Sequence, residues 1–251
     1  SPSITNCTFN YSNYGITNSG VCTPIINNNT FDNLVYSPMV ISLVAYPAST
    51  TGNVISGTTY KCIRVDTETL TQDVTLPKRS FGGVDNIPYF FQSYTIGTGV
   101  TLTIAPGVVC KFWNAGQMTV NNGLIAEGLA TNAGNIVFTS ITDDFHGGDS
   151  NSDGTASGYG SYTWQGILVN DVALDPQTRF ANCIFRYADY STAAGIKTIN
   201  ASPSILNCSF NNSYQGVQAS GASNPLINFC DFYNLSNFAV NNVNQSFVIQ
   251  A

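Results

Sequence analysis

A run of acidic and amide side chains between Asp143 and Thr155 carries the residue types best suited to chemistry in this sequence. The pattern Asp149-x-Asn151-x-Asp153-Gly matches the opening of a calcium-binding loop, in which alternate side-chain oxygens converge on one cation. The bidentate glutamate that closes an EF-hand loop is missing, because Gly160 takes its place. Asp143 or Asp144 would have to supply the remaining carboxylate. We predict a structural Ca²⁺ site with the candidate ligands Asp143, Asp144, Asp149, Asn151 and Asp153; the alternative is a solvated turn.

Catalytic signals are weaker. His146 is the only histidine, and no second His, Cys or activated hydroxyl lies at a recognisable spacing from it, so we expect an ordinary loop residue. Trp164 is expected to pack beneath the acidic loop rather than to stack on a sugar. The best candidates for a cluster of the polysaccharide-lyase kind are Arg186, Tyr187, Asp189, Tyr190 and Lys197. We predict no catalytic residue and no enzymatic activity, with a polysaccharide lyase as the alternative.

A repeated frame indicates which elements position these residues. The string Ser-Pro-Ser-Ile-x-Asn-Cys-x-Phe-Asn occurs at residues 1–10 and again at 202–211. Weaker copies begin at Pro24 and Pro225, in both cases 22 residues after the proline of the full copy. Short alternating apolar runs broken by Asn, Gly, Ser and Pro are typical of strands and turns. A period of this length suits one coil of a parallel β-helix with three short strands, and the frame asparagine suits a turn.

Composition supports a folded all-β solenoid. Only 9% of the 251 residues are charged and 43% are hydrophobic, so the chain has ample apolar surface to bury. The net charge of −6 provides no basic stripe, and we expect no nucleic-acid partner. No apolar run is long enough to span a membrane. The chain opens within a repeat, and we expect any export signal to lie outside this segment.

Cysteine and phenylalanine recur at fixed places in the frame. In a solenoid this predicts a vertical file of inward-facing side chains along one wall, with Asn29 interrupting a stack of buried thiols. Internal disulfides stay open as an alternative, although the 7 cysteines cannot all pair with one another. The residues predicted to stack are Cys7, Asn29, Cys183, Cys208, Cys230, Phe9, Phe31, Phe185, Phe210 and Phe232.

The middle of the chain reads as further coils with another consensus. Its strings Leu-Thr-Ile-Ala-Pro-Gly-Val-Val-x-Lys-Phe, Ile-Val-Phe-Thr-Ser and Trp-x-Gly-Ile, followed by Asn-Cys-x-Phe-Arg-Tyr-Ala, resemble right-handed parallel β-helix repeat proteins of bacterial surfaces. The resemblance covers most of Pro88 to Phe232, and Pro2 to Asn33. It implies a right-handed β-helix with coils of about 22–25 residues. We expect coils at 1–42, an irregular or inserted segment at 43–87, and coils at 88–251 with the calcium-like loop at 143–155.

The same resemblance implies a secreted, extracellular or cell-surface protein with a structural or adhesive role. We expect the chain to be one window of a longer tandem solenoid or filament, whose partners are copies of itself or adjoining repeats placed end to end. Surface glycans are a further candidate partner. The tyrosines that could stack on sugars, if exposed, are Tyr14, Tyr187, Tyr190, Tyr214 and Tyr233.

Overall fold

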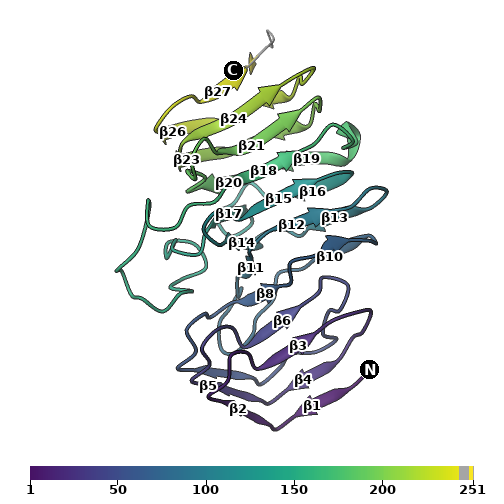
Figure 1. Ribbon diagram of the computed structural model, residues 1–251, viewed down its shortest axis with the longest axis vertical. Coiled ribbons are helices and arrows are strands. Elements are labelled where there is room, and N and C mark those ends of the chain that lie inside the picture. The colour runs from purple at the N-terminus through teal and green to yellow at the C-terminus, as the bar shows by residue number, and fades with distance from the viewer. Residues whose placement is uncertain (243–248, 251) are drawn as a thin grey trace.

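The computed structural model describes residues 1–242, 249 and 250, which form an all-β parallel solenoid of about 10 turns with coils of about 24 residues (Figure 1). The predicted parallel β-helix is therefore confirmed. Besides strands, the described residues form one short 3-10 helix, η1 (Asp175–Gln177). None of the described helical segments has the length and apolarity needed to span a membrane.

One nine-stranded sheet runs along the whole stack. All of its strands are parallel, and each is contributed by a successive coil. From the first coil to the last, the strands are β3 (Ile16–Asn18), β6 (Met39–Ile41), β8 (Ile63–Val65), β11 (Tyr89–Phe91), β14 (Val109–Phe112), β17 (Ile136–Ser140), β20 (Cys183–Arg186), β23 (Ser209–Ser213) and β26 (Asp231–Leu235).

The other sheets differ between the two ends of the stack. The first coils add a two-stranded sheet, β1 (Ser3–Thr5) and β4 (Ile25–Asn27), and a three-stranded sheet, β2 (Thr8–Asn10), β5 (Thr30–Asp32) and β7 (Val54–Ser56). Later coils add two seven-stranded sheets. One contains β9 (Thr69–Leu70), β12 (Tyr94–Ile96), β15 (Gln117–Val120), β18 (Gly166–Val169), β21 (Ala194–Ile199), β24 (Gln215–Ser220) and β27 (Val240–Asn242). The other contains β10 (Val74–Leu76), β13 (Thr101–Ile104), β16 (Gly123–Glu127), β19 (Thr178–Ala181), β22 (Ser204–Leu206), β25 (Leu226–Asn228) and β28 (Ile249–Gln250).

The repeated frame changes sheets along the stack. In the first coils the strand that carries the frame phenylalanine belongs to the three-stranded sheet, where Phe9 pairs with Phe31. In the last coils the equivalent strand belongs to the nine-stranded sheet, where Phe210 pairs with Phe185 and Phe232. The predicted single file is therefore wrong. The structure has two phenylalanine files, and ring centroids within them are 4.7–5.1 Å apart at near-parallel orientation.

The cysteines divide in the same way. Cys7 is exposed, which corrects the prediction of a buried thiol, and its N–H donates to the Asn29 side chain at 3.0 Å. Asn29 occupies the cysteine position of the frame in the second coil and is fully buried, so this position holds a polar side chain there. Cys208 lies against Cys183 and Cys230 in the last coils. All seven cysteines fall within the described residues and are free thiols.

Residues 43–87 were expected to be irregular or inserted, and the structure corrects this expectation. The segment contributes β7, β8, β9 and β10, each of which pairs in register with strands of neighbouring coils. The solenoid therefore continues through it. Figure 1 shows instead that the chain leaves the stack between β17 and β18, where residues 141–165 stand out as a long excursion. We call these residues the lateral loop.

Candidate functional site

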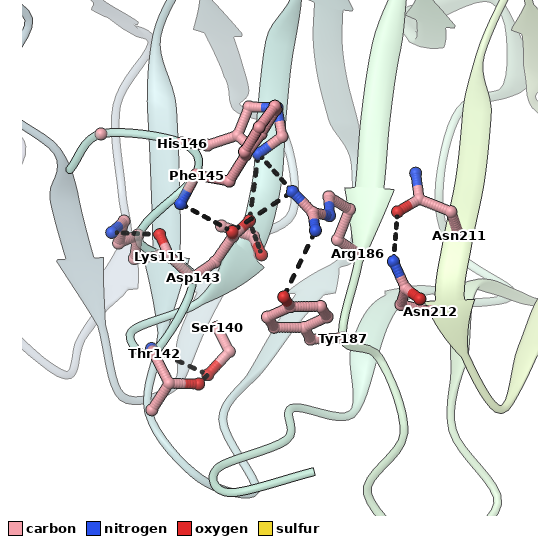
Figure 2. A network of polar contacts seen from close by, with 12 residues as sticks. Lys111, Ser140, Thr142, Asp143, Phe145, His146, Arg186, Tyr187, Asn211 and Asn212 are labelled. Atoms are coloured by element: carbon pink, nitrogen blue, oxygen red, sulfur yellow. Dashed lines mark hydrogen bonds and ion pairs between the residues drawn. The ribbon is translucent and has the colours of Figure 1, made fainter. Parts of the chain in front are cut away.

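The lateral loop folds back on the outer face of the nine-stranded sheet, and Lys111 of β14 holds it there. The Lys111 side chain points outward from the solenoid, yet it is fully buried under the loop. Its ammonium group donates to the carbonyl oxygen of Asp143 (Figure 2) and to that of Gly148, both at 2.8 Å. Burial lowers the pKa of Lys111 to about 8, although the nearby Asp143 opposes the shift. The loop is thus fastened by a buried cation, at the cost of desolvating that cation.

Contacts on both sides of Lys111 spread the loop over neighbouring coils. Towards the first coils, the Ser150 carbonyl accepts the Lys61 N–H at 2.9 Å. Towards the last coils, the Tyr159 hydroxyl donates to Asp189 at 2.8 Å. The loop therefore crosses the sheet and leaves open surface on either side of itself.

Asp143 points from the lateral loop toward the outer face of the nine-stranded sheet, where it makes a polar network with residues of β17, β20 and the loop itself (Figure 2). Its carboxylate accepts from Thr139 at 2.8 Å and lies 3.1 Å from His146 Nδ1 and 3.2 Å from Arg186 Nη1. Burial alone would raise the pKa of Asp143. The His146 hydrogen bond and the Arg186 charge outweigh burial and hold that pKa below its usual value. Asp143 is thus partnered within the protein and lies outside the cluster of acidic groups described next.

Three other predicted ligands come together. Carboxylate oxygens of Asp144, Asp149 and Asp153 all lie within 4.8 Å of one another, so this triad could hold a metal ion. Asp149 accepts the backbone N–H groups of Asp153 and Gly154, each at 3.1 Å, which curls the loop around the triad. Burial and the charge of Asp149 raise the pKa of Asp144, as expected where carboxylates crowd together.

Unpartnered oxygens accompany the triad. Among the described residues, one oxygen each of Asp144, Asn151 and Asp153 is shielded from solvent and accepts no hydrogen bond. Asn151 donates through its amide nitrogen to Asp153 at 2.8 Å, which leaves its carbonyl oxygen free. Buried acceptors without partners are costly, and oxygen-binding cations are one way to satisfy them.

A second feature lies on the same sheet face, beside the loop and toward the first coils. Tyr14, Tyr36 and Tyr60 precede β3, β6 and β8, and their rings follow one another at centroid distances of 5.1 and 6.4 Å. Phe90 continues the row 5.7 Å from Tyr60. Trp113 sets its edge against both, at 5.9 Å from each. With Ser37, Arg64 and Gln92, these rings line a cavity of about 350 Å³ that we call the aromatic groove.

The lateral loop forms one boundary of the aromatic groove. Tyr162 of the loop tilts against Trp113 with ring centroids 5.0 Å apart. Arg64 projects from β8 among the rings, where it donates to the Tyr14 hydroxyl at 2.6 Å and to the Gln92 carbonyl oxygen at 2.7 Å. Aromatic faces and a few oriented polar groups therefore share one concave surface.

A larger groove of about 600 Å³ lies on the other side of the loop and includes His146, Arg186, Asn211 and Tyr233 in its lining. The predicted lyase-like cluster is not assembled there. Arg186 belongs to β20 in the nine-stranded sheet, whereas Lys197 belongs to β21 in one of the seven-stranded sheets. Residues that are close in sequence are thus divided between two walls.

The remaining predictions divide between the two grooves and the core. Trp164 was expected to pack beneath the acidic loop; it is fully buried, but it stacks on Phe112 at 4.3 Å in the core of the solenoid. Tyr14 lines the aromatic groove and Tyr233 the larger one, whereas Tyr187 is buried.

Most of the aromatic groove was not predicted from the sequence, namely Tyr36, Tyr60, Arg64, Phe90, Gln92 and Trp113. One signal was present. The steps from Tyr14 to Tyr36 and from Tyr36 to Tyr60 are 22 and 24 residues, close to one coil. Lys111 was also missed, because nothing in its strand marks the loop that covers it.

Comparison of the chain with protein-family models, with curated proteins and with solved structures found no match in any of the three.

Proposed function

We propose that this chain is a non-enzymatic extracellular β-solenoid with an adhesive role, which binds a glycan in the aromatic groove. The observation that carries the proposal is the row of rings contributed by successive coils to one outer face. Sugar rings present apolar C–H faces that pack on aromatic side chains, and their hydroxyl groups need polar partners nearby. Ser37, Arg64 and Gln92 offer such partners within the same groove.

The stacked architecture suits a repeating ligand. Because each coil adds one ring to the row, the groove runs along the solenoid axis rather than closing around a single small molecule. A polysaccharide lying along this direction would meet similar contacts at each step. The scaffold beneath is rigid, since the sheet is continuous and its inward side chains are packed.

We also propose Ca²⁺ as the structural ion of the lateral loop. The triad and its unpartnered oxygens supply the hard oxygen ligands that Ca²⁺ prefers. Asp144, Asp149, Asn151 and Asp153 would hold the ion. Asp143 is left out of this set because Arg186 and His146 already occupy its carboxylate.

Polysaccharide cleavage is the second candidate function, and the larger groove beside Arg186 and His146 is what favours it. The carboxylate of Asp143 neutralises Arg186 there. We rank cleavage below binding because the Arg186 guanidinium group is already paired with this carboxylate.

The glycan proposal is tested by measuring the affinity of the chain for panels of immobilised polysaccharides. Tyr60→Ala removes the central ring of the row, and we expect it to weaken binding by about tenfold or more. Tyr11→Ala is the matched control, because Tyr11 is 80% exposed and lies outside the groove. Equal binding by the two variants, or no binding by the unaltered chain, would contradict the proposal. Shortening of the recovered polysaccharide would favour cleavage instead.

A further inference from the structure

The guanidinium group of Arg64 is held in the aromatic groove without a counter-charge. Three ion pairs occur among the described residues, and they join His146 and Arg186 to Asp143 and Arg179 to Glu127. Arg64 takes part in none of them. Its two recorded hydrogen bonds go to neutral acceptors, the Tyr14 hydroxyl and the Gln92 carbonyl oxygen.

These neutral partners orient the group. The Arg64 guanidinium carbon lies 5.4 Å from the centroid of the Tyr14 ring, and its two terminal nitrogens are each fixed by one acceptor. A guanidinium group carries five N–H donors, so donors remain for a ligand. Arginine is well matched to carboxylates, because its planar fork can donate two parallel hydrogen bonds.

The positive charge of Arg64 contrasts with the net negative charge of the chain. The chain carries a net charge of −6 with only 8 basic residues, and it is not a general attractor of anions. At physiological salt, charges separated by more than about 8 Å are largely screened, so a local cation decides which ligand group binds beside it. The combination of stacked rings and one oriented guanidinium group therefore selects a ligand that is both ring-shaped and acidic.

We infer that the aromatic groove binds an acidic polysaccharide whose sugar rings carry carboxylate groups. Its carboxylate pairs with the free N–H groups of Arg64, while its rings pack on Tyr36, Tyr60 and Trp113. This inference rests on the proposed glycan-binding function and adds the class of sugar to it.

A matched pair of probes tests the inference. Polygalacturonate oligomers carry a carboxylate on each ring, and the same oligomers after chemical reduction of that group carry a neutral hydroxymethyl instead. We expect the unaltered chain to bind the acidic oligomer at least about tenfold more tightly, as measured by titration calorimetry. Arg64→Gln should remove this preference, so that this variant binds the two oligomers with equal affinity. Arg64→Lys, which keeps the charge and loses the fork, should retain part of the preference.

Further variants separate the acidic specificity of the groove from its glycan-binding function. Arg179→Gln removes a partly exposed arginine outside the groove and should leave the preference intact. The acidic specificity would be overturned if the unaltered chain and Arg64→Gln both bound the two oligomers with equal affinity. The glycan-binding function would still stand if Tyr60→Ala bound neither oligomer. Failure of the unaltered chain to bind either oligomer would overturn the acidic inference, and binding of another polysaccharide in the panel that depends on Tyr60 would still support the function.

Discussion

Single asparagine side chains set the corners of this solenoid. At the turn of the frame, Asn6, Asn28, Asn182 and Asn207 all adopt left-handed backbone, with φ between 49° and 56°. Asparagine tolerates this conformation better than other side chains with a Cβ, because its short amide can bond to the local backbone. The last copy breaks the pattern. Phe229 occupies the turn position with φ of 53°, and its ring is 65% exposed.

We predict that Phe229→Asn stabilises the chain. The substitution relieves the unfavourable backbone of a bulky residue and gives up little burial, so we expect a gain of about 1 kcal/mol in the free energy of unfolding. Chemical denaturation measures it. Phe238→Asn is the matched control, since Phe238 is 53% exposed and has no left-handed backbone. An equal effect of the two substitutions would contradict the explanation.

Lys111 is the residue on which the loop depends most directly. Its pKa is lowered to about 8 in the folded chain, against an ordinary value of 10.5. Between these values the unfolded chain binds more protons than the folded chain, so the contribution of Lys111 to stability rises with pH. The neutral amine can still donate to the two carbonyl oxygens that fix the loop.

We therefore expect the stability of the unaltered chain, relative to Lys111→Met, to increase as the pH is raised from about 8 to about 10. Urea unfolding of both chains across this range measures the difference, and other titrating groups cancel because both chains contain them. A difference that is constant or falls with pH would show that the ammonium group is not desolvated beneath the loop.

At the scale of elements, the lateral loop is what turns one face of a regular solenoid into two grooves. Lys111 and the Asp143 network attach its first part, and the carboxylate triad lies in the part that follows. Tyr162, near its end, packs against Trp113 of the aromatic groove. A cation that neutralises the triad would reduce repulsion within the loop and favour this folded arrangement.

Calcium is predicted to protect the lateral loop. A ligand present at a hundredfold excess over its Kd stabilises the form that binds it by about 3 kcal/mol. We expect Ca²⁺ to slow proteolysis within residues 141–165 by a corresponding factor, or to raise the unfolding temperature where loop and solenoid unfold together.

Asp149→Asn should abolish the protection. Asp171→Asn, an exposed aspartate outside the loop and the triad, should retain it. Identical proteolysis with Ca²⁺ and with a chelator would leave the triad as a solvated acidic turn.

At the scale of the whole molecule, the stack has strand edges as well as faces. β1 and β2 of the first coil each pair on one side only among the described strands. Their sequences, Ser-Ile-Thr and Thr-Phe-Asn, contain none of the charged residues that commonly discourage edge pairing. We propose that these edges meet another coil, from an adjoining repeat or a second copy.

Self-association through this edge is expected to rise with concentration in sedimentation velocity. The double variant Ser3→Lys, Thr8→Lys places charge on both exposed edge strands and should reduce association by about tenfold or more. Thr192→Lys alters an exposed position elsewhere and should have no effect. A monomer at every concentration tested would contradict the proposal.

The repeated frame was sufficient to predict a parallel β-helix, its coil length and its asparagine turns. These follow from local rules, since alternating apolar residues form strands and asparagine accepts left-handed backbone wherever the chain lies. The burial of Trp164 was likewise predictable, although its place in the core against Phe112 was not. The candidate site was predictable only in part: Asp144, Asp149 and Asp153 meet as their spacing suggested, while Asp143 turns away to Arg186, 43 residues further along the chain.

Local patterns in this chain therefore specify the coil, whereas the stacking of coils specifies the sites. The same frame places Phe9 in one sheet and Phe210 in another, because the sheet that receives a strand depends on the coils beneath it and not on the strand alone. Tyr14, Tyr36, Tyr60 and Trp113 form a surface only after five successive coils are in register. Contacts between residues so far apart in sequence leave no local pattern, since their geometry is set by packing and by the loop that crosses the sheet.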